Sequence, residues 1–208
     1  MAVAERRQEL RASLVDAAER IVAEQGLPAL KARDLAAAVG CALGAIYTVF
    51  PDLDALVLEV NLRTLAVFEA ALSRSAPASP PESSDEAAAE LARLGAAYLA
   101  FASQHPRRWR ALFQHRMAHG QAPPPWYVEQ QARLFERIEA PLAALRPDLP
   151  EGERALLART LFSASHGVVS LGLDEKLAAL PPAVVATQLD TVIRAMAAGL
   201  ARHIPGDG

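Results

Sequence analysis

Side chains able to do chemistry are sparse in this chain, which has one cysteine and five histidines among 208 residues. Ser163, Ser165 and His166 fall close together, but no evident acidic partner or oxyanion hole accompanies them, and the chain has neither a phosphate-binding glycine loop nor a nucleophile elbow. His115 and His119 have the i, i+4 spacing that suits a metal ion, yet no cysteine or carboxylate stands at a matching ligand position in that segment. We therefore expect no catalytic residues, no metal site, no cofactor and no enzymatic activity.

The elements that must position any site are predicted to be helices throughout. The chain is 52% hydrophobic and rich in alanine, leucine, arginine and glutamate, which lose little side-chain freedom in a helix. No segment shows the sustained period-2 alternation of a strand. The fold class is all-α, and the predicted helices are Ala4–Gln25, Ala32–Val39, Leu43–Phe50, Asp52–Leu72, Asp85–Gln104, Arg107–Met117, about Pro123–Arg146, Glu151–Leu173 and Ala183–His203.

A proline- and serine-rich stretch, SRSAPASPPESS, divides the chain and is predicted to be a loop or linker over 73–84. It separates an N-terminal segment of about 72 residues from a C-terminal domain over 85–205. The N-terminus has no apolar signal core, and no uninterrupted apolar run approaches the roughly 18 residues that span a bilayer. With a single cysteine as well, we expect a cytoplasmic protein with no membrane partner.

The most specific motif is KARDLAAAVGCALGAIYTVF, Lys31 to Phe50. A helix-turn-helix needs a small residue where its helices cross, a residue tolerant of positive φ in the turn, and a branched apolar residue that fixes the second helix. Ala36, Gly40 and Ile46 supply these at offsets of four and six. A generic helical hairpin is the alternative, but the three-point spacing favours a helix-turn-helix over 31–50.

Residues from about 8 to 68 resemble the DNA-binding domain of the tetracycline-repressor (TetR) family, in a long first helix that ends in EQG and in the strings RDLAAAVG, GAIY and FPDLDAL. The resemblance implies a homodimer that binds a palindromic double-stranded DNA operator through the second short helix of each copy. It also implies a C-terminal helical domain that holds a small-molecule effector. The predicted function is a ligand-responsive transcription regulator, a repressor that the effector releases from its operator.

The residues predicted to bind DNA come from this motif. Lys31, Tyr47 and Thr48 stand where the family contacts phosphates, and backbone N–H groups near Gly44 assist, although Leu53 replaces the lysine usual before the fourth helix. Small or apolar side chains that can contact thymine methyl groups fill the second short helix, so specificity is expected to rest on apolar contacts and DNA shape. The predicted set is Lys31, Arg33, Ala42, Leu43, Gly44, Ala45, Tyr47 and Thr48.

The first fifty residues carry six basic and six acidic groups, so only their arrangement can make a positive face. Arg6, Arg7 and Arg11 could form a basic patch at the N-terminus or be ordinary solvated charges. Cys41 in the turn is interpreted as a small apolar residue, with a redox role as the alternative.

In the C-terminal half, LFSASHGVVSL and HPRRWRALF resemble the Trp-His-Gly subgroup of TetR effector domains, with Phe162 in place of the expected tryptophan. Aromatic residues and histidines here could form a bundle core or line an apolar pocket with a few polar groups. The residues predicted to bind the effector are Phe101, His105, Trp109, Phe113, Met117, Trp126, Phe162 and His166.

The last two predicted helices carry small and apolar residues suited to a dimer seam, which is where the family forms one. The predicted interface residues are Ala164, Gly167, Leu189, Val192 and Met196. The resemblance further implies that the fourth helix, 52–72, transmits the ligand signal, with Phe68 facing the C-terminal domain.

Two other functions stay open at this point. The neutral charge of the N-terminal segment and Leu53 would also fit a helical small-molecule-binding or enzymatic protein whose helix-turn-helix no longer works. A purely structural helical interaction module is the second alternative. Repression and activation both fit the motif.

Overall fold

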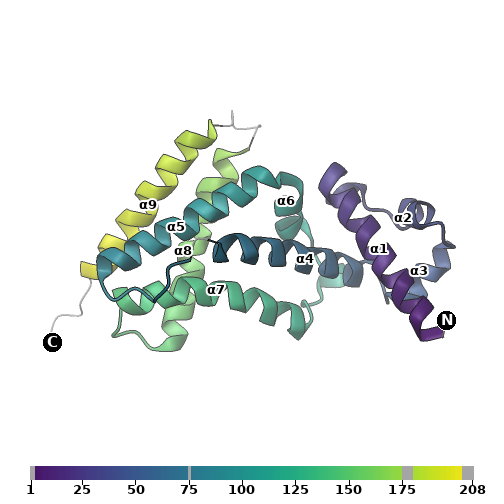
Figure 1. Cartoon of the computed structure of the whole chain (residues 1–208), viewed down its shortest axis with the longest axis horizontal. Coiled ribbons are helices and arrows are strands. Elements are labelled where there is room, and N and C mark those ends of the chain that lie inside the picture. Colours follow the sequence, from purple (N-terminus) through teal and green to yellow (C-terminus); the bar gives the residue numbers. More distant parts are fainter. Residues whose placement is uncertain (1–2, 75, 175–179, 203–208) are drawn as a thin grey trace. The chain divides into compact units, whose positions relative to one another are not determined.

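The structure is a computed structural model that describes residues 3–74, 76–174 and 180–202. Within these ranges it contains α-helices and two short 3-10 helices, and no strand (Figure 1). The predicted all-α class is confirmed. The helices are α1 (Val3–Gln25), α2 (Ala32–Val39), α3 (Leu43–Val49), α4 (Leu53–Ser73), α5 (Ser84–Gln104), α6 (Pro106–Gln114), α7 (Pro125–Leu145), α8 (Glu151–Gly172) and α9 (Pro182–Arg202), with 3-10 turns η1 (Leu27–Ala29) and η2 (Ala118–Gly120).

Local chemistry explains why the first helices end where they do. Gly26 follows α1 with φ 86°, and Gly40 ends α2 in the left-handed region with φ 76°, a backbone conformation that glycine adopts at low cost. The side chain of Asp52 accepts a 2.7 Å hydrogen bond from the backbone N–H of Ala55 and so caps α4. These residues set where α1 and α2 end and where α4 begins.

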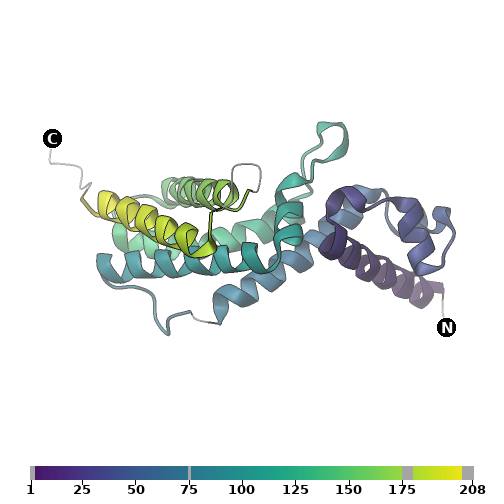
Figure 2. The same ribbon diagram turned by 90° about the horizontal axis from the view of Figure 1, so that it is seen from above.

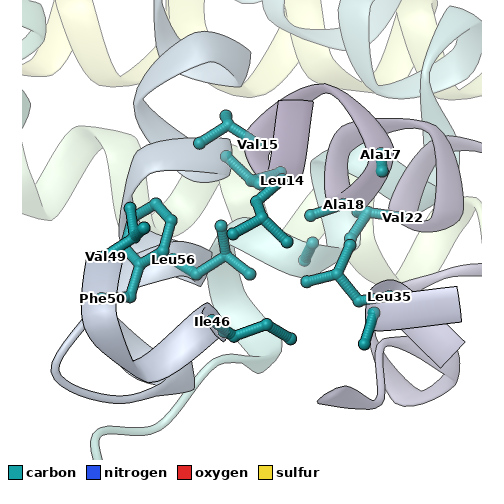
Figure 3. Close-up of a cluster of buried hydrophobic side chains, with 13 residues drawn as sticks. Leu14, Val15, Ala17, Ala18, Val22, Leu35, Ile46, Val49, Phe50 and Leu56 are labelled. Atoms are coloured by element: carbon teal, nitrogen blue, oxygen red, sulfur yellow. The ribbon is translucent and has the colours of Figure 1, made fainter. Parts of the chain in front are cut away.

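The chain divides into two compact units. The first unit comprises the described residues up to Val67 together with His105–Val128, and here α1 packs against α2, α3 and α6. Its core gathers apolar side chains from α1, α2, α3, the start of α4 and α6 (Figure 3). The residues with the least exposure are Leu14, Ala18, Val22, Leu35, Ile46, Phe50, Leu56, Val60 and Ala111.

The second unit comprises Phe68–Gln104 and the described residues from Glu129 onward. Here α9 runs beside α5 and also packs on α8 (Figures 1 and 2). Gly95 of α5 makes the close approach possible, because a Cβ at this position would lie 2.3 Å from Cδ1 of Ile193. Val185 packs in the same way over Gly172 at the end of α8, where a Cβ would lie 2.9 Å from Cγ2 of Val185.

The segment between α5 and α7 differs most from the sequence-based expectations. His105–Val128, which we included in the predicted C-terminal domain, packs with the first unit, and Ala111 lies in that unit's core. The predicted domain bounds stay a prediction. The helix predicted over Arg107–Met117 ends at Gln114, so His115 and His119 do not share one helix and the i, i+4 argument for a metal does not apply. The side chain of His119, like residue His203 of the predicted last helix, lies outside the described part.

One helix in the described part, α9, is long and apolar enough to cross a membrane by length and composition; α2 and α3 meet the same test only when joined across a 95° bend. Asp190 and Arg194 interrupt the apolar sequence of α9, which is why the sequence predicts no membrane span there. These two form an ion pair one helical turn apart, and Leu189 and Ile193 are buried inside the second unit. A packed helix of a helical bundle can have the same length and composition, so these two features do not identify α9 as a membrane span.

Candidate functional site

Helix α3 presents one face to solvent and anchors the other in the core. Ile46 and Val49 are 0% and 6% exposed and pack in the core of the first unit. Leu43 and Tyr47, one turn apart on the opposite side, are 41% and 50% exposed despite their size. An exposed leucine and tyrosine side by side on a rigidly held helix form a surface suited to contact with another molecule.

The turn before α3 is held by backbone hydrogen bonds. The N–H of Gly40 donates to the carbonyl oxygens of Ala36 and Ala37 at 2.9 and 3.2 Å, and the N–H of Cys41 donates to Ala36 at 3.0 Å. Cys41 is half-buried and packs against the core. This packing supports the interpretation of Cys41 as a small apolar residue.

Arg11 does not belong to a free basic patch. Its guanidinium forms an ion pair with Glu59 of α4, donates to the carbonyl oxygen of Val49 at 3.1 Å, and lies 4.4 Å from the ring centre of Phe50. Arg11 therefore ties α1 to the end of α3 and to α4. Arg6 and Arg7 are exposed.

A second set of ion pairs joins α1, α4 and α6 inside the first unit. Glu19 pairs with Arg63 of α4 and with Arg108 of α6. The hydrogen bond from Arg63 to Asp16 raises the pKa of the Arg63 guanidinium, against the opposing effect of partial burial. Both ion pairs neutralise the charge of an arginine with a carboxylate of the same unit.

Aromatic side chains form a connected cluster in the second unit. The ring of Phe68, near the end of α4, lies 5.7 Å from the ring of Tyr98 and 5.0 Å from that of Phe101, both on α5. Phe162 of α8 lies 5.4 Å from Tyr98 and stacks on His166 at 5.9 Å. Such pairs fall within the usual 4.5–7 Å range of favourable aromatic contacts.

The cluster contains one polar pair, Tyr98 and His166. The Tyr98 hydroxyl and Nδ1 of His166 are hydrogen-bonded at 2.7 Å. Burial lowers the pKa of His166, because the charged imidazolium loses solvation there. The pair therefore offers neutral hydrogen-bonding groups among apolar rings, a combination typical of small-molecule sites.

Helices α8 and α9 expose apolar and small residues. Leu156 and Leu171 of α8 are 67% and 60% exposed, and Val184 of α9 is 41% exposed. A Cβ placed on Gly167 or Gly199 would meet no neighbouring atom within 4 Å in the described part. This face has room for close approach by a second helix pair.

Comparison with known families decides the identity. The model for bacterial regulatory proteins of the tetR family matches residues 14–60, and the model for tetracyclin repressor-like C-terminal domains matches residues 91–196. The chain belongs to the TetR family. It is a ligand-responsive DNA-binding transcription regulator and not an enzyme, as the sequence predicted. The assignment to the Trp-His-Gly subgroup stays a prediction.

Solved structures share this TetR fold along almost the whole chain. A protein of unknown function from Rhodococcus sp. RHA1 is 26% identical, with a TM-score of 0.64 over 93% of this chain and 96% of the other. A tetR-family regulator from Streptomyces coelicolor is 21% identical, with a TM-score of 0.58 over 100% and 93%. RolR in complex with resorcinol is 17% identical, with a TM-score of 0.61 over 98% of each chain. Comparison with curated proteins finds no match.

The residues predicted to bind DNA lie in and beside the helix-turn-helix, and most of them are accessible to solvent. All eight are exposed except Ala45, which is half-buried. Lys31 precedes α2 and Ala42 precedes α3, both with extended backbone. The Thr48 hydroxyl donates to the carbonyl oxygen of Ala45 at 2.7 Å, so it would have to rotate to donate to a phosphate.

The eight residues predicted to bind the effector do not fall in one unit. Phe101, Phe162 and His166 meet in the aromatic cluster of the second unit. The other five lie in the first unit. Trp109 is buried, with its ring 5.7 Å from that of Phe113, while His105 and Met117 are half-buried and precede α6 and η2. Trp126 lines a shallow cleft of about 400 Å³, together with Arg11, Glu59, Leu62 and Arg63.

The predicted interface residues differ in their accessibility. Ala164, Gly167, Val192 and Met196 are half-buried within the single chain. Leu189 is 1% exposed and packs over Gly95 inside the second unit, so it has no surface left for a partner. The apolar stripe of α9 could not, by itself, indicate which of its residues face α5 and which face outward.

Tyr98 and Asn61 carry polar groups but were not among the predicted site residues. Tyr98 was treated as one more core aromatic, and only the fold brings its hydroxyl to His166. Asn61 was passed over within the apolar stripe of α4, although a lone amide among Leu58, Val60 and Leu65 was a visible signal.

Proposed function

We propose that this regulator is a cytoplasmic homodimeric repressor that holds a palindromic operator with α3 of each protomer and releases it when a small molecule binds. The observation that carries the proposal is the geometry of α3, whose inner face is locked by Ile46 and Val49 while Leu43 and Tyr47 project into solvent. A recognition helix needs this combination, because an exposed side chain can select a base only if its backbone is held in register.

In this proposal the contacts divide by chemistry. Lys31, Tyr47 and Thr48, with the backbone at Gly44, contact phosphates and position the protein without selecting sequence. Leu43, with the methyl groups of Ala42 and Ala45, contacts thymine methyl groups. Arg33, exposed on the first turn of α2, is the candidate for a base edge.

The electrostatics of the first unit favour few phosphate contacts. Arg11, Arg63 and Arg108 are all paired with carboxylates of the same unit, and Leu53 brings no charge. Each phosphate neutralised by a cation steepens the salt dependence of binding. We therefore expect a shallow dependence of operator affinity on salt, with selectivity resting on apolar contacts and DNA shape.

The proposed effector site in the second unit is the aromatic cluster. Phe101 and Phe162 supply apolar surface, and Tyr98 with His166 supplies the polar contact. A lowered pKa keeps the His166 imidazole neutral near pH 7, so an uncharged or weakly polar effector fits it best.

The proposed dimer seam lies on the outward faces of α8 and α9. Exposed Leu156 and Leu171, together with the unfilled space at Gly167 and Gly199, support close packing of two symmetry-related helix pairs. Val192 and Met196, only half-covered within one chain, complete the apolar surface.

The test joins assembly to DNA binding. Wild type and a variant with Val192→Glu and Met196→Glu are compared by light scattering and by fluorescence anisotropy on palindromes from the protein's own upstream region. We expect wild-type dimers that bind one palindrome, and monomeric variants that bind it at least tenfold more weakly, because two half-sites are no longer joined. A wild type that prefers no palindrome, or glutamate variants that remain dimers with full affinity, would contradict the proposal.

A further inference from the structure

Asn61 is the only asparagine of the chain and lies on α4 in the first unit. Its side chain is 1% exposed, and neither Oδ1 nor Nδ2 has a hydrogen-bond partner within the described residues. A buried amide that has lost its hydration without gaining partners destabilises the fold. A leucine of similar size would suit this position better, so the amide needs an explanation other than packing.

The helical period shows which elements Asn61 faces. Asp54, Asn61 and Thr64 are spaced i, i+7 and i+10 and so share one face of α4. At one end of that face, Nε of Arg108 on α6 lies 3.4 Å from the Thr64 hydroxyl oxygen. At the other end, the backbone N–H of Ala118 donates to Asp54 at 2.7 Å. Asn61 therefore lies along the seam between α4 and the segment from α6 to η2.

Nothing in that seam meets the needs of the amide. The α6 residues one turn after Arg108 are Ala111 and Leu112, whose side chains carry no polar atom. At one end Arg108 is already paired with Glu19, and at the other the buried Nε2 of His115, 3.5 Å from Asp54, has no hydrogen-bond partner within the described residues. Between these ends the Asn61 amide stands without a hydrogen-bond partner.

We propose that the α4–α6 seam of the first unit binds a small uncharged hydroxyl compound, which Asn61 recognises. A hydroxyl group can donate to Oδ1 and accept from Nδ2, so one group satisfies both halves of the amide. A charged ligand does not fit, because the neutral amide cannot compensate a buried charge and Arg108 is already paired with Glu19. The site lies in the unit that carries the helix-turn-helix and is separate from the aromatic cluster of the second unit.

The inference is tested on the full-length dimer with two probes of similar shape, phenol and toluene, which differ in one hydroxyl group. Affinities are measured by titration calorimetry for wild type, for Asn61→Leu, and for the control Thr64→Val. Thr64 lies in the same seam, but its hydroxyl already donates to the carbonyl oxygen of Val60 at 3.1 Å. Operator binding is measured in parallel for all three proteins.

We expect wild type to prefer phenol to toluene by roughly tenfold, the factor that one or two neutral hydrogen bonds supply. Asn61→Leu should lose this preference and melt at the same or a higher temperature, while Thr64→Val should keep the preference and melt at a lower one. A wild type that binds neither probe, or an Asn61→Leu protein that still prefers phenol, overturns the inference. Because operator binding is scored separately, its failure would count against the proposed repressor function and leave the site untouched.

Discussion

The glycine at the centre of the α5–α9 contact allows a quantitative test of the packing. In Gly95→Ala the new Cβ would lie 2.3 Å from Cδ1 of Ile193, more than 1 Å closer than the ~3.5–4.0 Å of an ordinary carbon–carbon contact. Ile193 is 5% exposed, so Cδ1 cannot turn into solvent. Overpacking of this kind costs ~1–3 kcal/mol, and the better helix propensity of alanine returns ~1 kcal/mol. We expect a net loss of about 1 kcal/mol in the free energy of unfolding.

The same contact predicts its own rescue. Ile193→Val removes Cδ1 and alone should cost ~0.5–1.5 kcal/mol. With that atom gone, Gly95→Ala keeps its propensity gain and should become neutral or stabilising, which gives a coupling energy of ~1–3 kcal/mol. The assay is urea unfolding followed by circular dichroism at one fixed protein concentration, because a dimer's apparent stability depends on concentration. Additive effects, or a Gly95→Ala protein as stable as wild type, would refute the proposed packing of α9 on α5.

Three further predictions concern the sites. Tyr47→Ala should weaken binding to every DNA sequence by roughly tenfold through a lost phosphate contact, whereas Leu43→Ala should change the selected bases; unchanged selection would remove Leu43 from the recognition surface. The fold lowers the pKa of His166, so the neutral imidazole contributes stability above the unfolded-state pKa of ~6.5, and this contribution is lost as the pH falls below that value. His166→Gln should therefore flatten the dependence of the unfolding free energy on pH in this window. An unchanged slope would mean that the pH dependence comes from another group. Phe68→Ala should reduce operator release more than effector affinity, because its ring contacts Tyr98 and Phe101 from a helix that begins in the first unit; equal losses would place Phe68 in the pocket or the core.

The N-terminal elements could be predicted because their signals are local. Gly26, Gly40 and Asp52 act on their own backbone neighbours, so each helix end fell within a residue or two of its predicted place. The helix-turn-helix followed for the same reason, since Ala36 and Ile46 need only the adjoining helix to define their packing. Family resemblance then supplied the function, which short-range patterns alone could not.

The remaining features depend on contacts between distant segments. Ala111 looks like any helical alanine, and nothing nearby in the sequence indicates that it enters the core built by α1 and α4. Leu189 and Val192 belong to the same apolar stripe of α9, but Gly95 on α5 determines that Leu189 packs inward. Arg11 looked like a DNA-facing cation because its partner Glu59 is 48 residues away. Packing partners, not propensity, determine these positions.

The way the chain passes between its two units bears on how an effector could act. It crosses three times, at Val67–Phe68 inside α4, at Gln104–His105 between α5 and α6, and at Val128–Glu129 inside α7. Two of these crossings lie within continuous helices, so no loop interrupts the chain at these points. The segment between the second and third crossings, His105–Val128, is held against α1 and α4 by two contacts. Arg108 forms an ion pair with Glu19, and the backbone N–H of Ala118 donates a hydrogen bond to Asp54. In the proposed mechanism, an effector acts by favouring one arrangement of α4. Its influence on operator affinity is then limited to its difference in affinity for the two arrangements.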